Sequence, residues 1–287
     1  MEIDLGYAGC LSNAIMNFDL LLEGMPSQPF FLIAGPCVVE SQDLCMEVAE
    51  KASVLCRERS IPYVFKASYR KANRSSAASF TGIGDEAALK VLSNVRSTYK
   101  IPVLTDIHNE AEAAMAAQSV DVLQIPAFLA RQSDLLQAAA RTGRWVNIKK
   151  GQFMSPASMS FAADKVRLEG NSRIWLTERG SQFGYHDLVV DFRSVPIMQS
   201  LGYPVVVDIT HALQRPNQES GVTAGTPEFI ETLGRAALAT GANGIFLETH
   251  PNPSQAKSDG ANMLALDKLE PLLDRLAALA NLVSRWS

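Results

Sequence analysis

A cluster of cationic and hydroxyl side chains occupies residues 66–76 of this 287-residue chain. Lys66 ends the apolar run Val64–Phe65, and further polar side chains follow it: Ser68, Arg70, Lys71, Asn73, Arg74, Ser75 and Ser76. Arg and Lys bind phosphate and carboxylate groups through charge-assisted hydrogen bonds, and Ser and Asn donate to the remaining oxygens. Because the whole chain carries a net charge of −4, these cations are locally concentrated. The segment favours a site for phosphorylated anions over a solvated basic loop.

The composition limits the classes of protein to which the chain can belong. Hydrophobic residues make up 47% and charged residues 20%, as in ordinary soluble globular proteins, and the length allows one large domain or two smaller ones. The mildly acidic balance argues against nucleic acid as a partner, which requires a broad basic surface. Since no apolar run reaches about 18 residues, we expect no membrane span.

The N-terminus and the cysteines indicate the compartment. The sequence MEIDLGYAGC has neither the basic region nor the continuous apolar stretch of a secretory signal. The four cysteines (Cys10, Cys37, Cys45 and Cys56) form no CxxC pair, so we expect no disulfide framework. The protein is predicted to be cytoplasmic.

Short apolar runs alternate with helical patterns along nearly the whole chain. The predicted strands are Phe30–Pro36, Tyr63–Ala67, Pro102–Asp106, Val122–Ile125, Val146–Lys149, Ile174–Thr177, Pro204–Asp208 and Gly244–Glu248. The clearest helical patterns are Asp43–Arg59, Asp85–Tyr99, Gln132–Thr142, Pro227–Thr240 and Leu266–Ser284. Eight such units predict an α/β fold of the TIM (β/α)8 barrel type, with the barrel over residues 30–287 and an N-terminal cap over residues 1–29. An open, doubly wound sheet is disfavoured because no GxGxxG follows a strand.

A polar or ionisable residue stands at the carboxyl end of every predicted strand. In chain order these are Cys37, Lys66, Asp106, Gln124, Lys149, Arg179, Asp208 with His211, and Glu248 with His250. A strand that is buried on both faces should be apolar throughout. All eight ends meet at one mouth of a barrel, where barrel enzymes place their active sites. The pattern therefore predicts an enzyme.

Eight segments carry more specific information. They are AGPCVVES (34–41), FKASYRKANRSS (65–76), TDIH (105–108), QIPAFLARQSDLL (124–136), VNIKKGQF (146–153), TERGSQFGYHDLVVDFRS (177–194), DITHALQRP (208–216) and ETHPNPSQAKSDG (248–260). In these segments, over roughly residues 30–284, the chain resembles the 3-deoxy-D-manno-octulosonate 8-phosphate synthases. The run KANRSS is close to diagnostic, because related barrel synthases carry other sequences there.

The resemblance implies condensation of phosphoenolpyruvate with D-arabinose 5-phosphate and water, on the way to bacterial lipopolysaccharide. It implies catalytic roles for Asp106, Lys71, His211 and Cys37. The substrate-binding residues would be Lys66, Ser68, Lys71, Asn73, Arg74, Ser75, Gln124, Pro126, Ala127, Arg131, Lys149, Arg179 and Asp208. Holding several anionic groups side by side requires several cations, and proximity is a large catalytic gain in a condensation. In this family a neighbouring subunit completes part of the sugar-phosphate site, which implies a homotetramer.

A divalent metal ion is expected as cofactor. Metal-dependent members of the resembled family carry AGPC after the first strand, where metal-independent members carry Asn. The matching ligands are Cys37, His211, Glu248 and Asp259. A thiolate, an imidazole and two carboxylates suit manganese, iron, cobalt or zinc better than magnesium. A lone Cys is more often a core residue, but four ligand types at the mouth favour a metal site. Whether the ion orients water, binds the aldehyde or organises the site stays open.

The chain departs from the family pattern in two places. Ala78 and Thr81 replace His and Arg, and Val222–Pro227 lacks the usual Arg. These changes affect the expected affinity for the sugar phosphate more than the reaction.

Two other functions stay possible: a Schiff-base aldolase that uses Lys149 or Lys66 as nucleophile, and a sensor of sugar phosphates without catalysis. The retained metal ligands disfavour the sensor, because binding alone does not need a metal.

Overall fold

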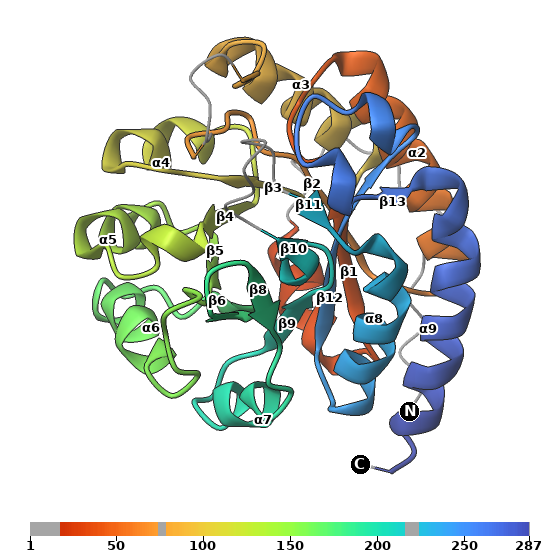
Figure 1. Ribbon diagram of the computed structural model, residues 1–287. Helices are drawn as coiled ribbons and strands as arrows, with labels where there is room; N and C mark the ends of the chain where they lie inside the picture. The colour runs from red at the N-terminus through yellow and green to blue at the C-terminus, as the bar shows by residue number, and fades with distance from the viewer. Residues whose placement is uncertain (1–17, 74–78, 216–223, 287) are drawn as a thin grey trace.

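A closed barrel of parallel strands forms the centre of the protein. The computed structural model describes residues 18–73, 79–215 and 224–286. Its barrel strands are β1 (Phe31–Gly35), β2 (Tyr63–Lys66), β3 (Val103–Asp106), β4 (Val122–Ile125), β5 (Trp145–Lys149), β6 (Ile174–Glu178), β9 (Val205–Asp208) and β12 (Gly244–His250). They pair in this order, and β12 closes the barrel by pairing with β1 in parallel, from Phe31 opposite Gly244 to Gly35 opposite Glu248 (Figure 1). The predicted (β/α)8 barrel is confirmed.

Helices surround this barrel, and one follows each barrel strand (Figure 1). They are α2 (Gln42–Glu58), α3 (Asp85–Tyr99), α4 (Glu110–Ala116), α5 (Ser133–Arg141), α6 (Met159–Leu168), α7 (Ser194–Gln199), α8 (Ile230–Ala239) and α9 (Leu269–Val283). The five helices predicted from periodicity are present, with ends shifted by up to three residues. Ser41 shows how the local sequence sets the start of a helix. Its hydroxyl accepts a hydrogen bond from the Leu44 N–H and so caps the N-terminus of α2.

Alternation along each strand divides the barrel interior into two layers. Val64, Leu104 and Phe246 belong to an apolar cluster inside the lower half of the barrel. Two residues further along the same strands, where a side chain returns to the same face, stand Lys66, Asp106 and Glu248. The residues between them point outward into the larger core between strands and helices. The interior is therefore apolar at the amino ends of the strands and polar at their carboxyl ends.

The amino end of the barrel is closed by the segment before the first strand. Helix α1 (Asp19–Gly24) and the 3₁₀ turn Met25–Ser27 place Phe18, Leu22 and Met25 in the apolar cluster of the barrel interior. Trp175 lies in the same cluster, with its ring centroid 4.9 Å from that of Phe31. Residues 1–17 of the predicted cap lie outside the described residues.

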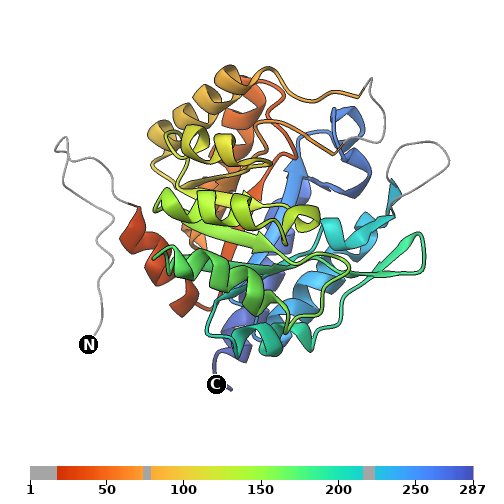
Figure 2. The same ribbon diagram turned by 90° about the vertical axis from the view of Figure 1, so that its left-hand side faces the viewer.

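The opposite end carries the longer loops. The hairpin of β7 (Ser181–Phe183) and β8 (Asp187–Val189) extends beyond the barrel at this end, and the short pair β10 (Gln214–Arg215) and β11 (Ala224–Gly225) lies beside it, whereas α1 lies at the other end (Figure 2). The described part of the chain contains no helix with the length and apolar character needed to cross a membrane. Cys37, Cys45 and Cys56 are all buried free thiols.

We predict that the closing helix α1 contributes to stability. Leu22 is fully buried in the barrel cluster, so Leu22→Ala should lower the free energy of unfolding by about 2–5 kcal/mol through lost burial and a residual cavity. Leu20→Ala on the same helix is the matched control, because Leu20 is 76% exposed and should cost about 0.5 kcal/mol or less. Denaturant unfolding of the three proteins measures the difference. Equal stability of both variants would show that α1 does not support the barrel.

Candidate active site

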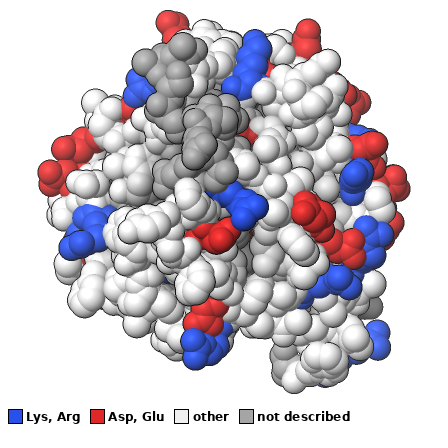
Figure 3. Space-filling view, in the orientation of Figure 1, with Lys and Arg blue, Asp and Glu red and all other residues white. Residues whose placement is uncertain are grey.

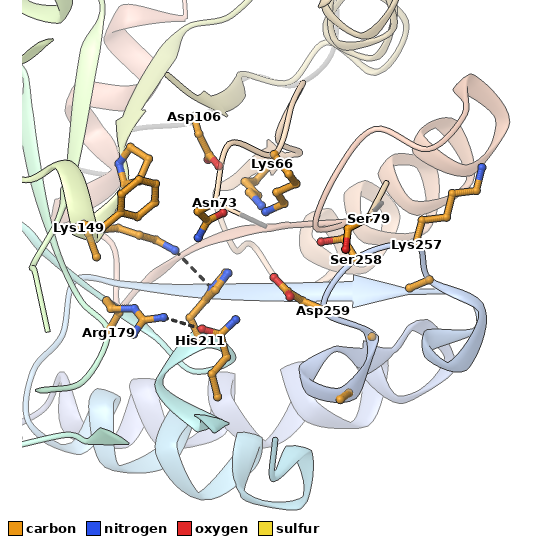
Figure 4. Close-up of a pocket in the computed structure, with 18 of the residues that line it drawn as sticks. Lys66, Asn73, Ser79, Asp106, Lys149, Arg179, His211, Lys257, Ser258 and Asp259 are labelled. Carbon is orange, nitrogen blue, oxygen red and sulfur yellow. Dashed lines mark hydrogen bonds between the residues drawn. The ribbon is translucent and has the colours of Figure 1, made fainter. Parts of the chain in front are cut away.

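A cavity of about 810 Å³ opens at the carboxyl ends of the strands. The described residues that line it include five cations, Lys66, Lys71, Lys149, Arg179 and Lys257, but only two carboxylates, Asp106 and Asp259. Figure 4 shows several of these side chains pointing toward one another across the cavity. On the outer surface of this face, Lys and Arg are spread among Asp and Glu (Figure 3). Lys66, Lys71, Lys149 and Arg179 are buried at this cavity, whereas Lys257 is exposed. The buried cationic side chains suit an anionic ligand.

Arg179 follows β6 and is held at the edge of the cavity. Its Nη2 donates to Gln214 Oε1 over 2.7 Å (Figure 4), while its buried Nη1 has no hydrogen-bond partner among the described residues. Burial lowers the pKa of Arg179, although the surrounding carboxylates oppose this shift. A buried guanidinium with an unused donor is a strong anion-binding group, because a ligand oxygen would satisfy the donor and offset the cost of burial.

Lys66 and Glu248 form a buried ion pair between β2 and β12. Lys66 Nζ lies 2.6 Å from Glu248 Oε1 and also donates to the Cys37 carbonyl over 2.9 Å. The backbone of Lys66 packs closely against β1 because Gly35 has no side chain, and a Cβ there would collide with the Lys66 carbonyl oxygen. Burial alone would raise the pKa of Glu248, but the charges of His211 and Lys66 lower it to about 2. Glu248 is therefore a carboxylate at neutral pH.

A second buried pair joins β5 and β9. Lys149 Nζ donates to Asp208 Oδ2 over 2.6 Å and lies 3.4 Å from His211 Nδ1 (Figure 4), which is itself 2.7 Å from Asp208 Oδ2. Burial lowers the pKa of Lys149 despite its partner Asp208, and Lys149 and His211 hold the pKa of Asp208 well below its usual range although burial opposes this. Asp208 therefore orients both the cation and the imidazole toward the cavity.

Asp106 lies on the opposite wall, where two neutral donors hold it. Ser68 Oγ donates to Asp106 Oδ2 over 2.6 Å, and Gln124 Nε2 donates to Asp106 Oδ1 over 2.7 Å. Burial would raise the pKa of Asp106, but the charges of Lys66, Lys71 and His108 hold it below its usual range. Burial would lower the pKa of Lys71, but the charges of its neighbours raise it and keep Lys71 charged; these neighbours are Cys37, Glu248, Asp106 and Asp259. Asp106 is thus an ionised group with a fixed orientation.

Cys37, Glu248 and Asp259 form a cluster that could hold a metal ion. One donor atom from each lies within 4.8 Å of the others, and Cys37 Sγ is 3.4 Å from Asp259 Oδ2. His211 Nε2 approaches this group at 3.4 Å from Glu248 Oε1. Asp259 reaches it from a left-handed backbone conformation with φ of 47°. A thiolate, two carboxylates and an adjacent imidazole fit a divalent transition ion.

The amino-acid sequence matches the model of the DAHP synthetase I family over residues 22–285. The chain belongs to this family. Its relatives include proteins named 2-dehydro-3-deoxyphosphooctonate aldolase from Cyanothece sp. (52% identical over 252 residues, 88% of this chain and 92% of the relative) and Koribacter versatilis (51% over 257 residues, 88% and 92%). Another is from Brucella melitensis (51% over 252 residues, 88% and 91%). The resemblance predicted from the sequence motifs is confirmed.

The structure brings most of the predicted residues of this family member together. Several line the cavity directly: Lys66, Lys71, Asn73, Asp106, Gln124, Pro126, Ala127, Lys149, Arg179, His211 and Asp259. Four other predicted residues lie buried behind this lining and contact it through the bonds described above: Cys37, Ser68, Asp208 and Glu248. Arg131 is exposed and does not line the cavity of its own barrel. Arg74 and Ser75 of KANRSS, and the substituted Ala78, lie outside the described residues.

Sequence reasoning missed several residues of the site. Ser258 is buried, and its Oγ lies 2.9 Å from Cys37 Sγ, although 221 positions separate the two residues. The same loop supplies Lys257. Asn147 and Thr177 form hydrogen bonds behind Gln124. The sequence held a signal for Asn147 and Thr177, since each is a polar residue that follows an apolar run in its strand.

We predict that Glu248 lowers the free energy of unfolding of the chelator-treated protein as the pH falls into the acid range. Because its pKa is about 2 in the folded protein and ordinarily 4.5, its contribution is present above pH 4.5 and is lost as pH falls toward 2. This loss should reach up to about 3 kcal/mol. Denaturant unfolding at several pH values should show a weaker pH dependence for Glu248→Gln, whereas Glu270→Gln at an exposed site should follow the unmodified protein. Parallel curves for all three proteins would contradict the proposed ion pair.

Proposed function

We propose that this protein condenses phosphoenolpyruvate with D-arabinose 5-phosphate and water. The products are 3-deoxy-D-manno-octulosonate 8-phosphate and inorganic phosphate, a step of Kdo formation for lipopolysaccharide. The observation that carries the proposal is a buried donor of Arg179 that has no hydrogen-bond partner in the described part of the chain, in a cavity whose described lining includes five cations and two carboxylates. The names of the relatives, 2-dehydro-3-deoxyphosphooctonate aldolase, support the same reaction.

The charges of the cavity match the charges of the two substrates. Phosphoenolpyruvate carries a phosphate and a carboxylate, and the sugar carries a second phosphate. Arg179, Lys149 and Lys71 hold phosphoenolpyruvate, and Lys66 lies beside them. Asn73 and its neighbours in KANRSS receive the sugar phosphate. Fixed cations overcome the repulsion between the anions, and holding both substrates together lowers the entropic part of the barrier.

The reaction joins a carbon of phosphoenolpyruvate to the aldehyde carbon of the sugar. A proton must reach the aldehyde oxygen as the bond forms, and another must leave the water that adds to the neighbouring carbon, which carries the phosphate. The bond from this carbon to the phosphate oxygen then breaks, so that inorganic phosphate leaves and the carbon becomes a keto group. Asp106 is ionised and held by two neutral donors, so it can accept the proton of water. Lys71 is charged and lies on the same cavity wall, so it can donate to the aldehyde oxygen. Asp208 orients His211 and Lys149 and stays ionised.

A divalent metal ion belongs to the same proposal. Cys37, Glu248, Asp259 and His211 would hold it, because their donor atoms gather at one wall of the cavity. A bound ion of this kind supplies a Lewis acid for an oxygen ligand or organises the surrounding side chains. Ser258 stabilises the sulfur side of this group by its contact with Cys37.

Assembly into a homotetramer completes the proposal. Arg131 is expected to bind substrate, yet it is exposed and lies outside the cavity of its own barrel. The proposal therefore assigns it to the cavity of a neighbouring copy. Large apolar side chains near the mouth support such a contact, since Phe128 is 42%, Phe153 61% and Phe183 72% exposed. Patches of this kind usually mark interfaces.

The reaction itself is tested by incubating the purified protein with phosphoenolpyruvate and D-arabinose 5-phosphate. Both substrates should be consumed and inorganic phosphate released. Borohydride added during turnover should leave no adduct, because a Schiff base on Lys149 or Lys66 is not part of this reaction. Faster turnover of erythrose 4-phosphate or N-acetylmannosamine, or a borohydride-trapped lysine, would overturn the assignment.

The Arg179→Ala variant sharpens this test. Loss of the guanidinium leaves a bound anion without its partner, at a cost of roughly 2–5 kcal/mol, so kcat/KM should fall by roughly 30-fold or more. Arg57→Ala is the control, because Arg57 is an exposed cation on α2. Near-normal activity of the Arg179→Ala protein would remove the basis of the proposed site.

We predict that the activity depends on the metal ion and on Cys37. A chelator should abolish activity, and manganese, iron, cobalt or zinc should restore it. Cys37→Ser should bind cobalt at least about tenfold more weakly, since a hydroxyl replaces a thiolate poorly. Cys45→Ala, which removes a buried thiol outside the cluster, should bind it normally. Chelator-resistant activity in Cys37→Asn would indicate an organising role, whereas full activity of the metal-free unmodified protein would refute the metal site.

The assembly is predicted to be lost together with the activity. Phe183→Asp introduces a charge at an exposed apolar position of the β7–β8 hairpin and should shift the mass measured by light scattering below that of a tetramer. Leu168→Asp, at an equally exposed position at the end of α6, is the control. A fully active monomer of the unmodified protein at assay concentration would contradict the proposal.

A further inference from the structure

A line of hydrogen bonds runs behind the cavity through four neighbouring barrel strands. It begins at Thr177 in β6, whose Oγ1 donates to Asn147 Oδ1 over 2.6 Å. Asn147 Nδ2 donates to Gln124 Oε1 over 2.9 Å, and Gln124 Nε2 donates to Asp106 Oδ1 over 2.7 Å. Ser68 completes the coordination of the carboxylate by donating to the other oxygen, Oδ2, over 2.6 Å. The line thus connects Asp106 to a hydroxyl three strands away.

The direction of every bond in this line follows from the charge of Asp106. An ionised carboxylate only accepts hydrogen bonds, so Gln124 must turn its NH₂ group toward Asp106. Its carbonyl oxygen then faces Asn147 and requires a donor, which only the NH₂ group of Asn147 can supply there. The oxygen of Asn147 in turn requires a donor on its far side. Thr177 supplies it, because a hydroxyl can donate in the required direction.

The end of the line is isolated from solvent. Asn147 and Thr177 are both fully buried, and neither lines the cavity. A buried polar group is costly unless it is hydrogen-bonded, so this buried pair stays favourable only while the line of hydrogen bonds is complete. Their neighbours in the layer below are Trp145 and Trp175, which belong to the apolar cluster. An apolar pair would fill this part of the barrel without that cost.

We propose that Thr177 and Asn147 are positioning residues that act through Gln124 to keep the Asp106 carboxylate hydrogen-bonded and correctly rotated for its role in the reaction. The charged groups that face Asp106 are Lys66, Lys71 and His108. They favour its ionised form, and the ionised carboxylate selects which end of Gln124 faces it. The hydroxyl of Thr177 satisfies the far end of the line in that direction.

The proposal makes a specific statement about Thr177→Val, which conserves shape and removes the hydroxyl. Without that donor, a buried oxygen of Asn147 has no partner. If both amides turn to relieve it, Gln124 presents its own carbonyl oxygen to Asp106, so the carboxylate loses a donor. Whichever arrangement forms, one acceptor along the line is unsatisfied. Thr177→Ser retains the donor and should behave like the unmodified protein.

The test combines steady-state kinetics with infrared spectroscopy of the full-length, metal-loaded protein. Because the inference rests on the proposed reaction of Asp106, the infrared measurement provides a readout that does not require turnover. Protein labelled with ¹³C-aspartate, compared with labelled Asp106→Asn, isolates the carboxylate stretch of Asp106. Thr177→Val should shift this band and reduce kcat about tenfold with little change in KM for phosphoenolpyruvate, whose cationic ligands are untouched. Thr177→Ser should restore both values.

Matched variants separate positioning from a loss of stability. Thr240→Val removes a hydroxyl that donates to helix carbonyls on α8, outside the barrel, and should change neither readout. If Thr177→Val does not fold, Asn147→Asp is the second variant, because a carboxylate there repels the oxygen of Gln124 and should shift the same band. An unshifted band in a folded Thr177→Val or Asn147→Asp protein overturns the proposal, and so does a kcat loss that Thr177→Ser shares. A shifted band in a protein that lacks the proposed activity would refute the reaction and leave the hydrogen-bond line intact.

Discussion

A charged side chain can be buried inside a barrel only if another group compensates for the water it has lost. This constraint governs the upper half of the interior, where Lys66 is paired with Glu248 and Lys149 with Asp208 at 2.6 Å each. Removing one member of such a pair leaves its partner as an uncompensated buried charge, which is strongly destabilising. The pairs thus fix the side chains that surround them, including His211, which contacts both Asp208 and Glu248. The geometry of the site depends on these pairs.

Around the cavity, within the described part of the chain, the group left without a partner is a cation rather than a carboxylate. Carboxylates in and behind the cavity are each matched by a cation or by neutral donors, but Arg179 keeps a buried donor that has no partner among the residues that the structure describes. The described side chains therefore leave room for negative charge, which an anionic ligand would supply. A buried donor of this kind can bind an anion without a large basic surface. The acidic exterior and the cationic interior are compatible because burial separates them.

Stability and chemistry are assigned to opposite ends of the same strands. Val64, Leu104 and Phe246, together with Leu22 of the closing helix, form an apolar layer that carries no functional group. Above it, polar side chains on the same strands are supported from below by close packing. A catalytic side chain needs a surrounding that does not relax, and a packed core supplies it. The hydrogen-bond line from Thr177 to Asp106 lies at the boundary between the two layers.

The sequence by itself determined the fold and much of the site, because both follow from local periodicity. Alternation along each strand and a polar residue at each strand end were enough to place Lys66, Asp106 and Glu248 at one mouth. The partners of these residues were decided only by tertiary structure. Strand order and stagger bring Asn147 to Gln124, and the path of the last loop brings Ser258 to Cys37 from 221 positions away. The outward position of Arg131 likewise depends on how its turn leaves the barrel. The periodicity of a strand predicts to which face of the strand a side chain points. The side chain that it contacts there belongs to a segment distant in the sequence, so only the packing of the tertiary structure decides that contact.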